Sequence, residues 1–235
     1  YRAFREEYEP TLKRYALVKI FKEDLFACYD NDKVVIGEDK NGNPKLENKA
    51  KYWWGHKSRR KYDRIVFSPG IEVAADHYNL WKGFAYEPVR GDGHEPLLAH
   101  LKDNICGGVD EYYKYLLGWM ARTVQRPADA GEVAVVLRGK QGTGKGVATR
   151  SFGELFGRHY LQVSNTKHLV GNFNTHLRDV VVLFADEAFY AGDKEHEGLL
   201  KSLITEPTLT VEGKGVDLEL SPNFLHIFMA SNSDW

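Results

Sequence analysis

Four short, mainly apolar runs mark the C-terminal half of the chain. Three have the length and composition of a buried β-strand, and the run at 160–163 predicts a further short strand. The runs are rich in β-branched and aromatic residues, and turn-forming or polar residues follow them. Apolar residues occupy consecutive positions, so we expect both faces of each strand to be covered, as in a parallel sheet flanked by helices. The runs lie at 133–137, 160–163, 180–185 and 224–230.

In the segments between and before these strands, apolar residues recur with the spacing of a helix. Apolar positions three and four residues apart direct one face of each segment toward a core. We predict helices at 97–101, 112–123, 147–155 and 199–204. The second helix carries a stripe that we interpret as core packing, formed by Tyr112, Tyr115, Leu116, Trp119, Met120 and Thr123. The combined pattern predicts an α/β fold.

The N-terminal part of the chain has a different pattern, in which short apolar segments are separated by turns. These segments lie at 16–21, 25–29, 34–36, 62–67 and 79–88. The Asn41-Gly42 pair is a strong signal for a hairpin turn, so we expect a small antiparallel sheet here. A turn-rich stretch at 89–95 separates this region from the helices.

Composition narrows the class of protein. Of the 235 residues, 43% are hydrophobic and 28% are charged, which is ordinary for a folded protein. The net charge of −1 provides no overall attraction to nucleic acid, so any such contact depends on local patches. No apolar run reaches the roughly 18 residues that a membrane-spanning helix needs, so we expect no membrane partner.

Cysteine usage and the chain ends add two expectations. Cys28 and Cys106 lie far apart and lack the spacing of a zinc site or redox pair. We interpret both as core residues of a protein in a reducing cytoplasm. The chain begins at Tyr1 and stops at Trp235 directly after a polar strand end, so we interpret it as a fragment.

A glycine-rich loop follows the first of the four strands. Its glycines and Lys145 have the spacing of a phosphate-binding loop (P-loop), in which backbone N–H groups and a lysine hold a nucleoside triphosphate. Gly146 stands where Ser or Thr normally ligates Mg²⁺; the sequence does not choose between Thr143 and Thr149 as substitutes. A turn that binds nothing is the alternative. The predicted ATP-binding residues are Gly139, Gln141, Gly142, Thr143, Gly144, Lys145, Gly146 and Val147.

Polar residues end two of the other strands. Asp186 and Glu187 follow the third run, and Asn232 follows the fourth. Ligands bind at the carboxyl ends of parallel strands, so we expect Asp186 to hold Mg²⁺ and Glu187 to polarise an attacking water. We expect the Asn232 amide to contact the γ-phosphate or that water. The alternatives are an acidic helix cap and a simple strand-ending turn.

Basic residues at two places are candidates for DNA contact. A predicted hairpin at 209–220 carries Lys214 between two glycines at its tip, where a lysine could touch a phosphate backbone, and Lys201 precedes it. The segment 49–61 combines two tryptophans with Lys57, Arg59 and Arg60. For both places the alternative is a solvated surface, with the tryptophans packed against a small sheet.

The order of these motifs resembles the superfamily 3 helicases, and most closely the helicase portion of phage- and plasmid-type primase-helicases. The stretches that carry the resemblance are GKQGTGKG at 139–146, VLFADEA at 182–188, KSLITEPTLTVEGKG at 201–215 and FMASN at 228–232. It extends upstream into FSPG, YNLWKGFA and VQRP, and so covers most of the chain after about residue 50.

The resemblance implies an AAA+-like P-loop sheet flanked by helices, with ATP and Mg²⁺ as cofactors. It also implies a hexameric ring of identical subunits around single-stranded DNA, and a primase domain upstream. Lys145, Glu187 and Asn232 would be catalytic, Lys214 would line the channel, and an arginine finger is expected beyond Trp235. On this basis we predict an α+β region at 1–90 that contacts DNA or a neighbouring subunit, a helical linker or collar at 91–128, and an ATPase core at 129–235.

Two other functions remain open at this point. Gly146 leaves room for an initiator or DNA-binding ring module that binds nucleotide with little hydrolysis. A small-molecule kinase with the same loop is the third alternative. The acidic pair favours hydrolysis over kinase chemistry, because it offers a carboxylate that can polarise water.

Overall fold

The structure is a computed structural model that describes residues 2–10, 14–164, 174–187, 194–213 and 216–232. The chain divides into two compact units, Tyr1–Asp63 and Arg64–Trp235. Their boundary lies earlier than the predicted boundary near residue 90. The predicted division into 1–90, 91–128 and 129–235 remains a prediction.

The first unit combines two antiparallel strand pairs with two short helices. Its core contains Ala3, Leu25 and Ala50, against which Trp54 and other half-buried side chains pack. The predicted turn at Asn41-Gly42 joins one of the strand pairs, and Gly42 has a φ of 81°, which favours glycine. The elements are β1 (Ala3–Glu9), β2 (Arg14–Ile20), α1 (Lys22–Cys28), β3 (Lys33–Glu38), β4 (Pro44–Asn48) and α2 (Lys49–Gly55).

Two expectations for this unit were wrong. The segment 25–29 belongs to helix α1 and its C-terminal cap rather than to a strand. Leu25 and Tyr29 are four residues apart, which suits one face of a helix, and both pack in the core. Cys28, the last residue of α1, is exposed, because this short helix buries only Leu25. Cys106, in the second unit, is buried as expected.

The second unit is built on a parallel sheet with helices on both faces, which confirms the predicted fold class. Among the described residues the strand order is β7-β12-β9-β8. The two middle strands are almost fully buried, which explains their uninterrupted apolar sequences. The four strands are β7 (Ala134–Arg138), β8 (Tyr160–Val163), β9 (Val182–Asp186) and β12 (His226–Ser231).

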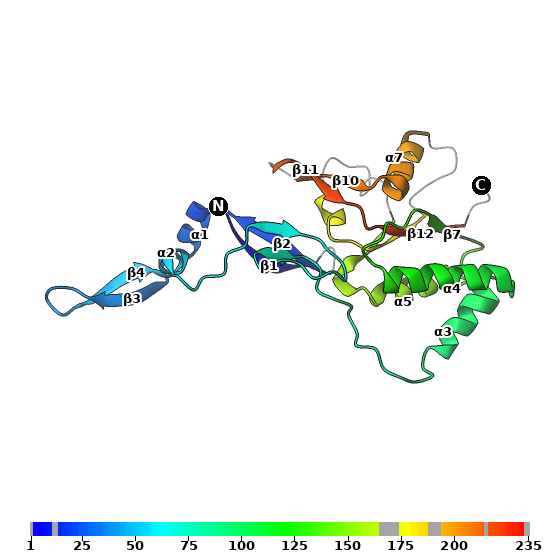
Figure 1. Cartoon of the computed structure of the whole chain (residues 1–235), viewed down its shortest axis with the longest axis horizontal. Helices are drawn as coiled ribbons and strands as arrows, with labels where there is room; N and C mark the ends of the chain where they lie inside the picture. The colour runs from blue at the N-terminus through cyan, green and yellow to red at the C-terminus, as the bar shows by residue number, and fades with distance from the viewer. Residues whose placement is uncertain (1, 11–13, 165–173, 188–193, 214–215, 233–235) are drawn as a thin grey trace. The chain divides into compact units, whose positions relative to one another are not determined.

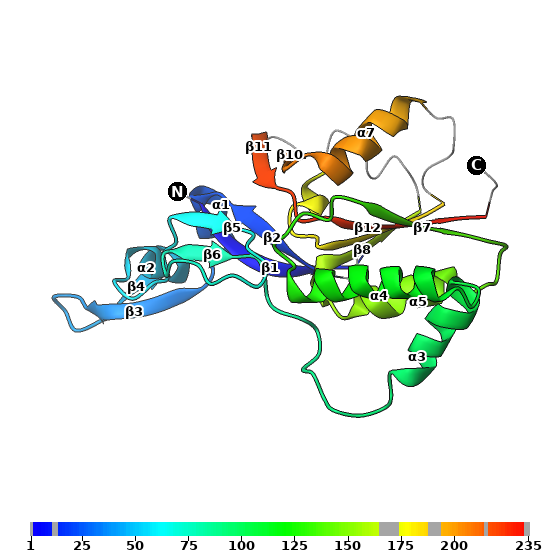
Figure 2. The same cartoon turned by 45° about the vertical axis from the view of Figure 1, so that its right-hand side comes forward.

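Helices cover the two faces of this sheet. Figures 1 and 2 show α4 (Asp110–Gln125) and α5 (Lys145–Glu154) on one face and α7 (Lys194–Thr205) on the other. On the first face the Trp119 ring packs edge-on against Phe228 of β12, with 4.6 Å between ring centroids. Leu116, Met120 and Thr123 are also buried. Tyr112 and Tyr115, however, are 63% and 61% exposed, so their interpretation as core residues was wrong. The buried face of α4 begins only at Leu116.

The remaining elements surround this sheet. Upstream segments pack beside it: the Trp81 ring stacks on His159 with 4.6 Å between centroids. The predicted hairpin at 209–220 is confirmed as the antiparallel pair of β10 and β11. The elements are β5 (Arg64–Val66), β6 (His77–Asn79), α3 (Glu95–Ala99), the π-helix η1 (His100–Ile105), the 3-10 turns η2 (Gly157–His159) and η3 (Thr175–Leu177), β10 (Thr208–Gly213) and β11 (Val216–Pro222).

Candidate active site

Three adjacent strands of the parallel sheet end side by side and bring the predicted site residues together. Ala230 of β12 pairs with Leu137 of β7 on one side and with Asp186 of β9 on the other. Backbone hydrogen bonding between the two chain segments continues past the end of β9, because the Glu187 N–H donates to the Ala230 carbonyl at 3.0 Å. The glycine-rich loop after β7, the acidic pair and Asn232 therefore meet at one edge of the sheet.

The glycine-rich loop, residues 139–144, runs from the end of β7 into helix α5. Gly142 and Gly144 have φ values of 81° and 83°, a conformation that non-glycine residues rarely adopt. Gly144 is the N-cap of α5, and Lys145 is its first residue. The N-terminus of this helix, with its free N–H groups and partial positive charge, therefore faces the same edge of the sheet as the acidic pair.

The Lys145 ammonium is fully engaged within the protein. Among the described residues, Nζ donates to the carbonyls of Gly139 at 2.5 Å and Lys140 at 3.0 Å, and to Asn232 Oδ1 at 2.8 Å. These three acceptors match the three donors of an ammonium group. Lys145 is only 9% exposed, so its charge is held in a largely desolvated position where an anion would interact strongly with it.

Asn232 links the lysine to the acidic pair. Its Oδ1 accepts from Lys145, and its Nδ2 donates to Glu187 Oε1. This pairing fixes the orientation of the amide, because the ammonium can only donate and the carboxylate accepts. An ammonium, an amide and a carboxylate thus form a continuous chain across the ends of β7, β12 and β9. Glu187 has a φ of 55°, an unusual value for a non-glycine residue.

Asp186 has a different environment from Glu187. Its Oδ2 accepts a hydrogen bond of 3.1 Å from Gln162 Nε2 of β8, and the residue is half-buried, whereas Glu187 is exposed. Gln162 was not predicted to belong to the site. The sequence does not show that β8 lies next to β9, and only this neighbourhood brings Gln162 close to Asp186. The carboxylate keeps an oxygen that Gln162 does not contact, as a cation ligand requires.

The donor set at this edge fits Mg²⁺, which needs few protein ligands when phosphate oxygens and water complete its coordination. The described residues contain no cluster of three or more His, Cys, Asp or Glu side chains that could enclose a metal alone. Thr149 is 1% exposed and donates its hydroxyl to the Lys145 carbonyl within α5, away from the loop. Thr143 is an exposed loop residue whose hydroxyl donates to the Lys140 carbonyl at 3.0 Å.

His100 is a second residue that sequence reasoning missed. Its Nε2 donates to the Gly144 carbonyl at 3.2 Å, and its Nδ1 accepts from Asn104 Nδ2 at 2.8 Å. A Cβ atom on Gly144 would lie 2.4 Å from the imidazole, so a larger residue would have to displace His100 as well as adopt a φ of 83°. His100 begins the π-helix η1, an irregularity often found at functional sites, and apolar spacing at 97–101 gave no sign of it.

The predicted DNA-contacting residues lie in several places. Lys214 lies outside the described residues, and Lys201 is exposed on α7. The hairpin of β10 and β11 is anchored beside Asn174, whose side chain donates to the Thr210 carbonyl at 2.7 Å and accepts from the Glu212 N–H at 2.8 Å. Asn174 immediately precedes η3, which leads into β9. Lys57, Arg59 and Arg60 follow α2 in the first unit.

Both the sequence and the fold have counterparts among known proteins. A model of a family of unknown function, DUF5906, matches residues 137–234, and no curated protein matches the sequence. The apo structure of the NrS-1 C terminal region (305–718) superposes with a TM-score of 0.69 at 21% identity, covering 97% of this chain and 54% of that chain. The A form apo structure of the same region gives 0.68 at 19% identity, again with coverages of 97% and 54%.

These similarities establish the fold of the chain. A further A form apo structure of the NrS-1 region (305–718) gives a TM-score of 0.64 at 20% identity, covering 98% of this chain and 54% of that one. The chain therefore spans about half the length of the structures it matches. Within the described residues, no helix is both long and apolar enough to cross a membrane.

Proposed function

We propose that the chain is the ATP-driven motor of a DNA helicase in a phage, plasmid or prophage replication protein. The observation that carries the proposal is the chain of hydrogen bonds from Lys145 through Asn232 to Glu187 across three strand ends. The sequence resemblance to primase-helicases supports it, as does the fold shared with the NrS-1 C terminal region. The proposed substrates are ATP and single-stranded DNA.

In this proposal the P-loop holds the triphosphate. Backbone N–H groups of the loop and of the first turn of α5 donate to phosphate oxygens, with Gln141 and Val147 at the exposed rim. Lys145 exchanges its contacts with the loop carbonyls for the β- and γ-phosphates. Asn232 then donates to the γ-phosphate or to the attacking water, and Glu187 orients that water by accepting its hydrogen bond.

Asp186 is the proposed anchor for Mg²⁺, with Gln162 holding its carboxylate in place and Thr143 within the loop as a further oxygen donor. When bound, Mg²⁺ neutralises developing charge on the phosphate oxygens. Lys145 would supply positive charge to the same phosphate oxygens.

DNA contact and ring assembly complete the proposal. We propose that Lys214, with Lys201 nearby in sequence, meets the DNA backbone in the channel of a hexameric ring, and that a neighbouring subunit supplies an arginine to each ATP site. Asn174 would connect the hairpin to β9, so that movement at the acidic pair reaches the DNA. A primase domain upstream is the proposed partner within the longer protein.

Strand displacement by the full-length protein tests this function. We expect ATP-dependent unwinding by the wild type and none by Lys145→Ala, because the loop lysine is essential for phosphate binding. Lys214→Ala should impair DNA binding and unwinding more than basal ATP turnover. Mass measurement with nucleotide and DNA should show a ring. A protein that remains monomeric under all conditions and does not unwind DNA contradicts the proposal.

Gly146 favours a second candidate, an initiator or DNA-binding ring module that binds nucleotide with little hydrolysis. The missing hydroxyl removes one expected Mg²⁺ ligand, and weak metal binding would slow hydrolysis more than nucleotide binding. ATP binding and ring formation without unwinding or DNA-stimulated hydrolysis would favour this module over the motor.

A further inference from the structure

Positive charge is concentrated in one segment of the first unit. Residues 1–63 contain 15 lysines and arginines against 11 aspartates and glutamates, whereas residues 64–235 contain 17 against 22. Segment 49–61 alone carries six basic residues and no acidic residue. The excess charge of the first unit therefore comes from α2 and the turn that follows it.

Two aromatic rings are presented beside this charge. Tyr52 and Trp53, neighbours on α2, are 44% and 43% exposed. The Trp53 ring meets Trp54 edge-on, with 6.2 Å between centroids, and Trp54 packs against the core. The Tyr52 ring contacts His56 at 5.5 Å. The Trp53 ring is thus backed by a residue that packs in the core, whereas the Tyr52 ring lies beside the exposed His56.

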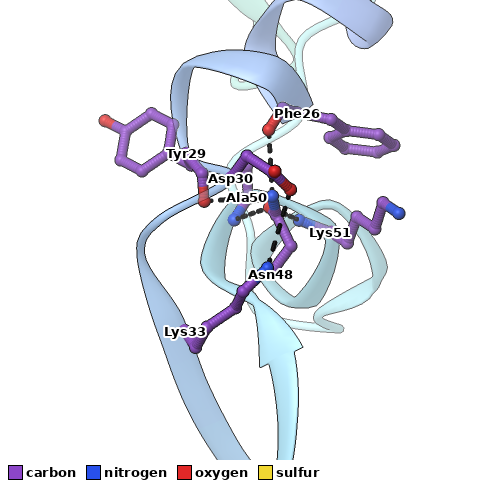
Figure 3. Close-up of polar contacts among 7 residues, drawn as sticks. All are labelled: Phe26, Tyr29, Asp30, Lys33, Asn48, Ala50 and Lys51. Carbon is purple, nitrogen blue, oxygen red and sulfur yellow. Dashed lines mark hydrogen bonds and ion pairs between the residues drawn. The ribbon is translucent and has the colours of Figure 1, made fainter.

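Asn48 holds this helix in a defined position (Figure 3). Its side-chain oxygen accepts from the N–H groups of Ala50 and Lys51 at 2.9 and 3.2 Å, which caps α2. Its Nδ2 donates to the carbonyls of Phe26 and Tyr29 at 2.9 and 3.0 Å, at the end of α1. One buried side chain therefore ties both helices together and orients Tyr52 and Trp53.

Four of the six basic side chains divide into two groups, and a fifth, Lys49, pairs with Asp32 at 3.8 Å. Arg59 lies over the Trp54 ring at 4.8 Å and Lys51 lies over Phe26 at 5.8 Å, so both extend the aromatic surface. Lys57 and Arg60 are exposed and form no ion pair with any residue in the described ranges. Exposed rings with such cations suit stacked bases and a phosphate backbone.

From this arrangement we propose that α2 and the following turn bind single-stranded DNA. Unpaired bases stack on Tyr52 and Trp53, while Lys57 and Arg60 contact phosphates. A protein partner fits less well, because lysine is depleted at protein interfaces and four of the six basic residues are lysines. The proposal requires neither ATP nor the loop lysine, so it stands or falls separately from the proposed motor.

Fluorescence anisotropy with labelled oligo(dT) tests the proposal on the full-length protein without nucleotide. We expect Trp53→Ala to weaken binding about tenfold, in line with roughly 1–3 kcal/mol for one stacked base. Lys57→Gln with Arg60→Gln should reduce the slope of log affinity against log salt by about 1–2, because each substitution removes one phosphate-binding cation. Tyr8→Ala, which removes another exposed ring of the first unit, should leave affinity unchanged.

Controls separate the alternatives. Each variant must retain the thermal unfolding profile of the wild type. The affinity for duplex DNA should not change in Trp53→Ala, because the bases of a duplex are not free to stack on a side chain. Unchanged oligo(dT) affinity in both Trp53→Ala and Tyr52→Ala overturns the proposal. A change in oligomeric mass with unchanged DNA affinity also overturns it and assigns the surface to a contact between copies.

Discussion

The Lys145 ammonium and the Asn232 side-chain oxygen lie 2.8 Å apart, although 87 residues separate them in sequence. The contact spans the first strand of the parallel sheet and the strand beside it. Asn232 also donates to Glu187, so its amide contacts both the lysine proposed to bind phosphate and the carboxylate proposed to polarise water. The amide therefore offers a physical route by which occupancy of the loop reaches the acidic pair.

Substitution of Asn232 should separate binding from hydrolysis. Asn232→Ala removes a donor aimed at the reacting groups but leaves the loop intact, so we expect hydrolysis about 100-fold slower and nucleotide affinity within a few-fold of wild type. Asn232→Asp places a second carboxylate between Lys145 and Glu187 and should weaken ATP binding itself. Steady-state kinetics and a fluorescent ATP analogue measure the two effects. Equal behaviour of both variants contradicts this role for the amide.

Gly146 can be tested by restoring the missing hydroxyl. A Cβ at this position would lie 3.5 Å from the Arg150 side chain, an ordinary contact, so Gly146→Ser should fold normally. We expect the Mg²⁺ concentration for half-maximal ATP hydrolysis to fall several-fold in Gly146→Ser. Gly146→Ala supplies the same Cβ without the oxygen and should not share the effect. If serine and alanine act alike, the hydroxyl is not the missing ligand.

His100 and Gly144 form a mutual constraint on the loop. Gly144→Ala should reduce ATP affinity at least tenfold, because the new Cβ meets the imidazole at 2.4 Å and the φ of 83° costs a further 1–2 kcal/mol or so. Combining it with His100→Ala removes the steric conflict but not the backbone strain, so we expect partial recovery. Nucleotide titrations of the single and double variants measure this. Strictly additive losses would rule out the contact as the cause.

His226 should make stability depend on pH. Burial lowers the pKa of His226 to about 4, below its ordinary value of 6.5. Between these values the unfolded chain binds a proton that the folded chain excludes, so the free energy of unfolding decreases as pH falls from 6.5 toward 4. The decrease from this residue approaches about 1.4 kcal/mol per pH unit.

Urea unfolding at several pH values measures this dependence. His226→Gln retains a polar side chain without a titrating group, so its stability should change less over the same window. Above pH 6.5 the free energies of unfolding of the wild type and of His226→Gln should change with pH in the same way. Identical slopes at low pH for both proteins would show that His226 is accessible to protons in the folded state.

The sequence predicted the elements whose causes are local. The apolar runs became the four strands of the sheet, and Asn41-Gly42 became a hairpin turn, because burial and turn chemistry act within a few residues. The helix at 112–123 formed, but its exposed Tyr112 and Tyr115 were not foreseen, since periodicity does not show how far a covering element extends. The segment 25–29 was too short for its period to distinguish helix from strand.

The site residues also divide into those that local sequence predicts and those that depend on packing between distant elements. Gly139, Lys145, Asp186 and Asn232 could be selected because each belongs to a motif at a strand end. His100 and Gln162 could not, because their contacts with Gly144 and Asp186 depend on packing between elements distant in sequence. The same holds for Asn174, whose bonds to β10 require knowledge of the hairpin's position.

ATP hydrolysis by Glu187→Gln, beside ATP binding by the same protein, tests the central claim most directly. The amide matches the carboxylate in shape but cannot polarise water as well, and residue 187 lies outside the loop proposed to hold the phosphates. We predict wild-type ATP affinity with hydrolysis reduced at least 100-fold, with or without single-stranded DNA. Hydrolysis at the wild-type rate would contradict a site that acts through Lys145, Asn232 and Glu187.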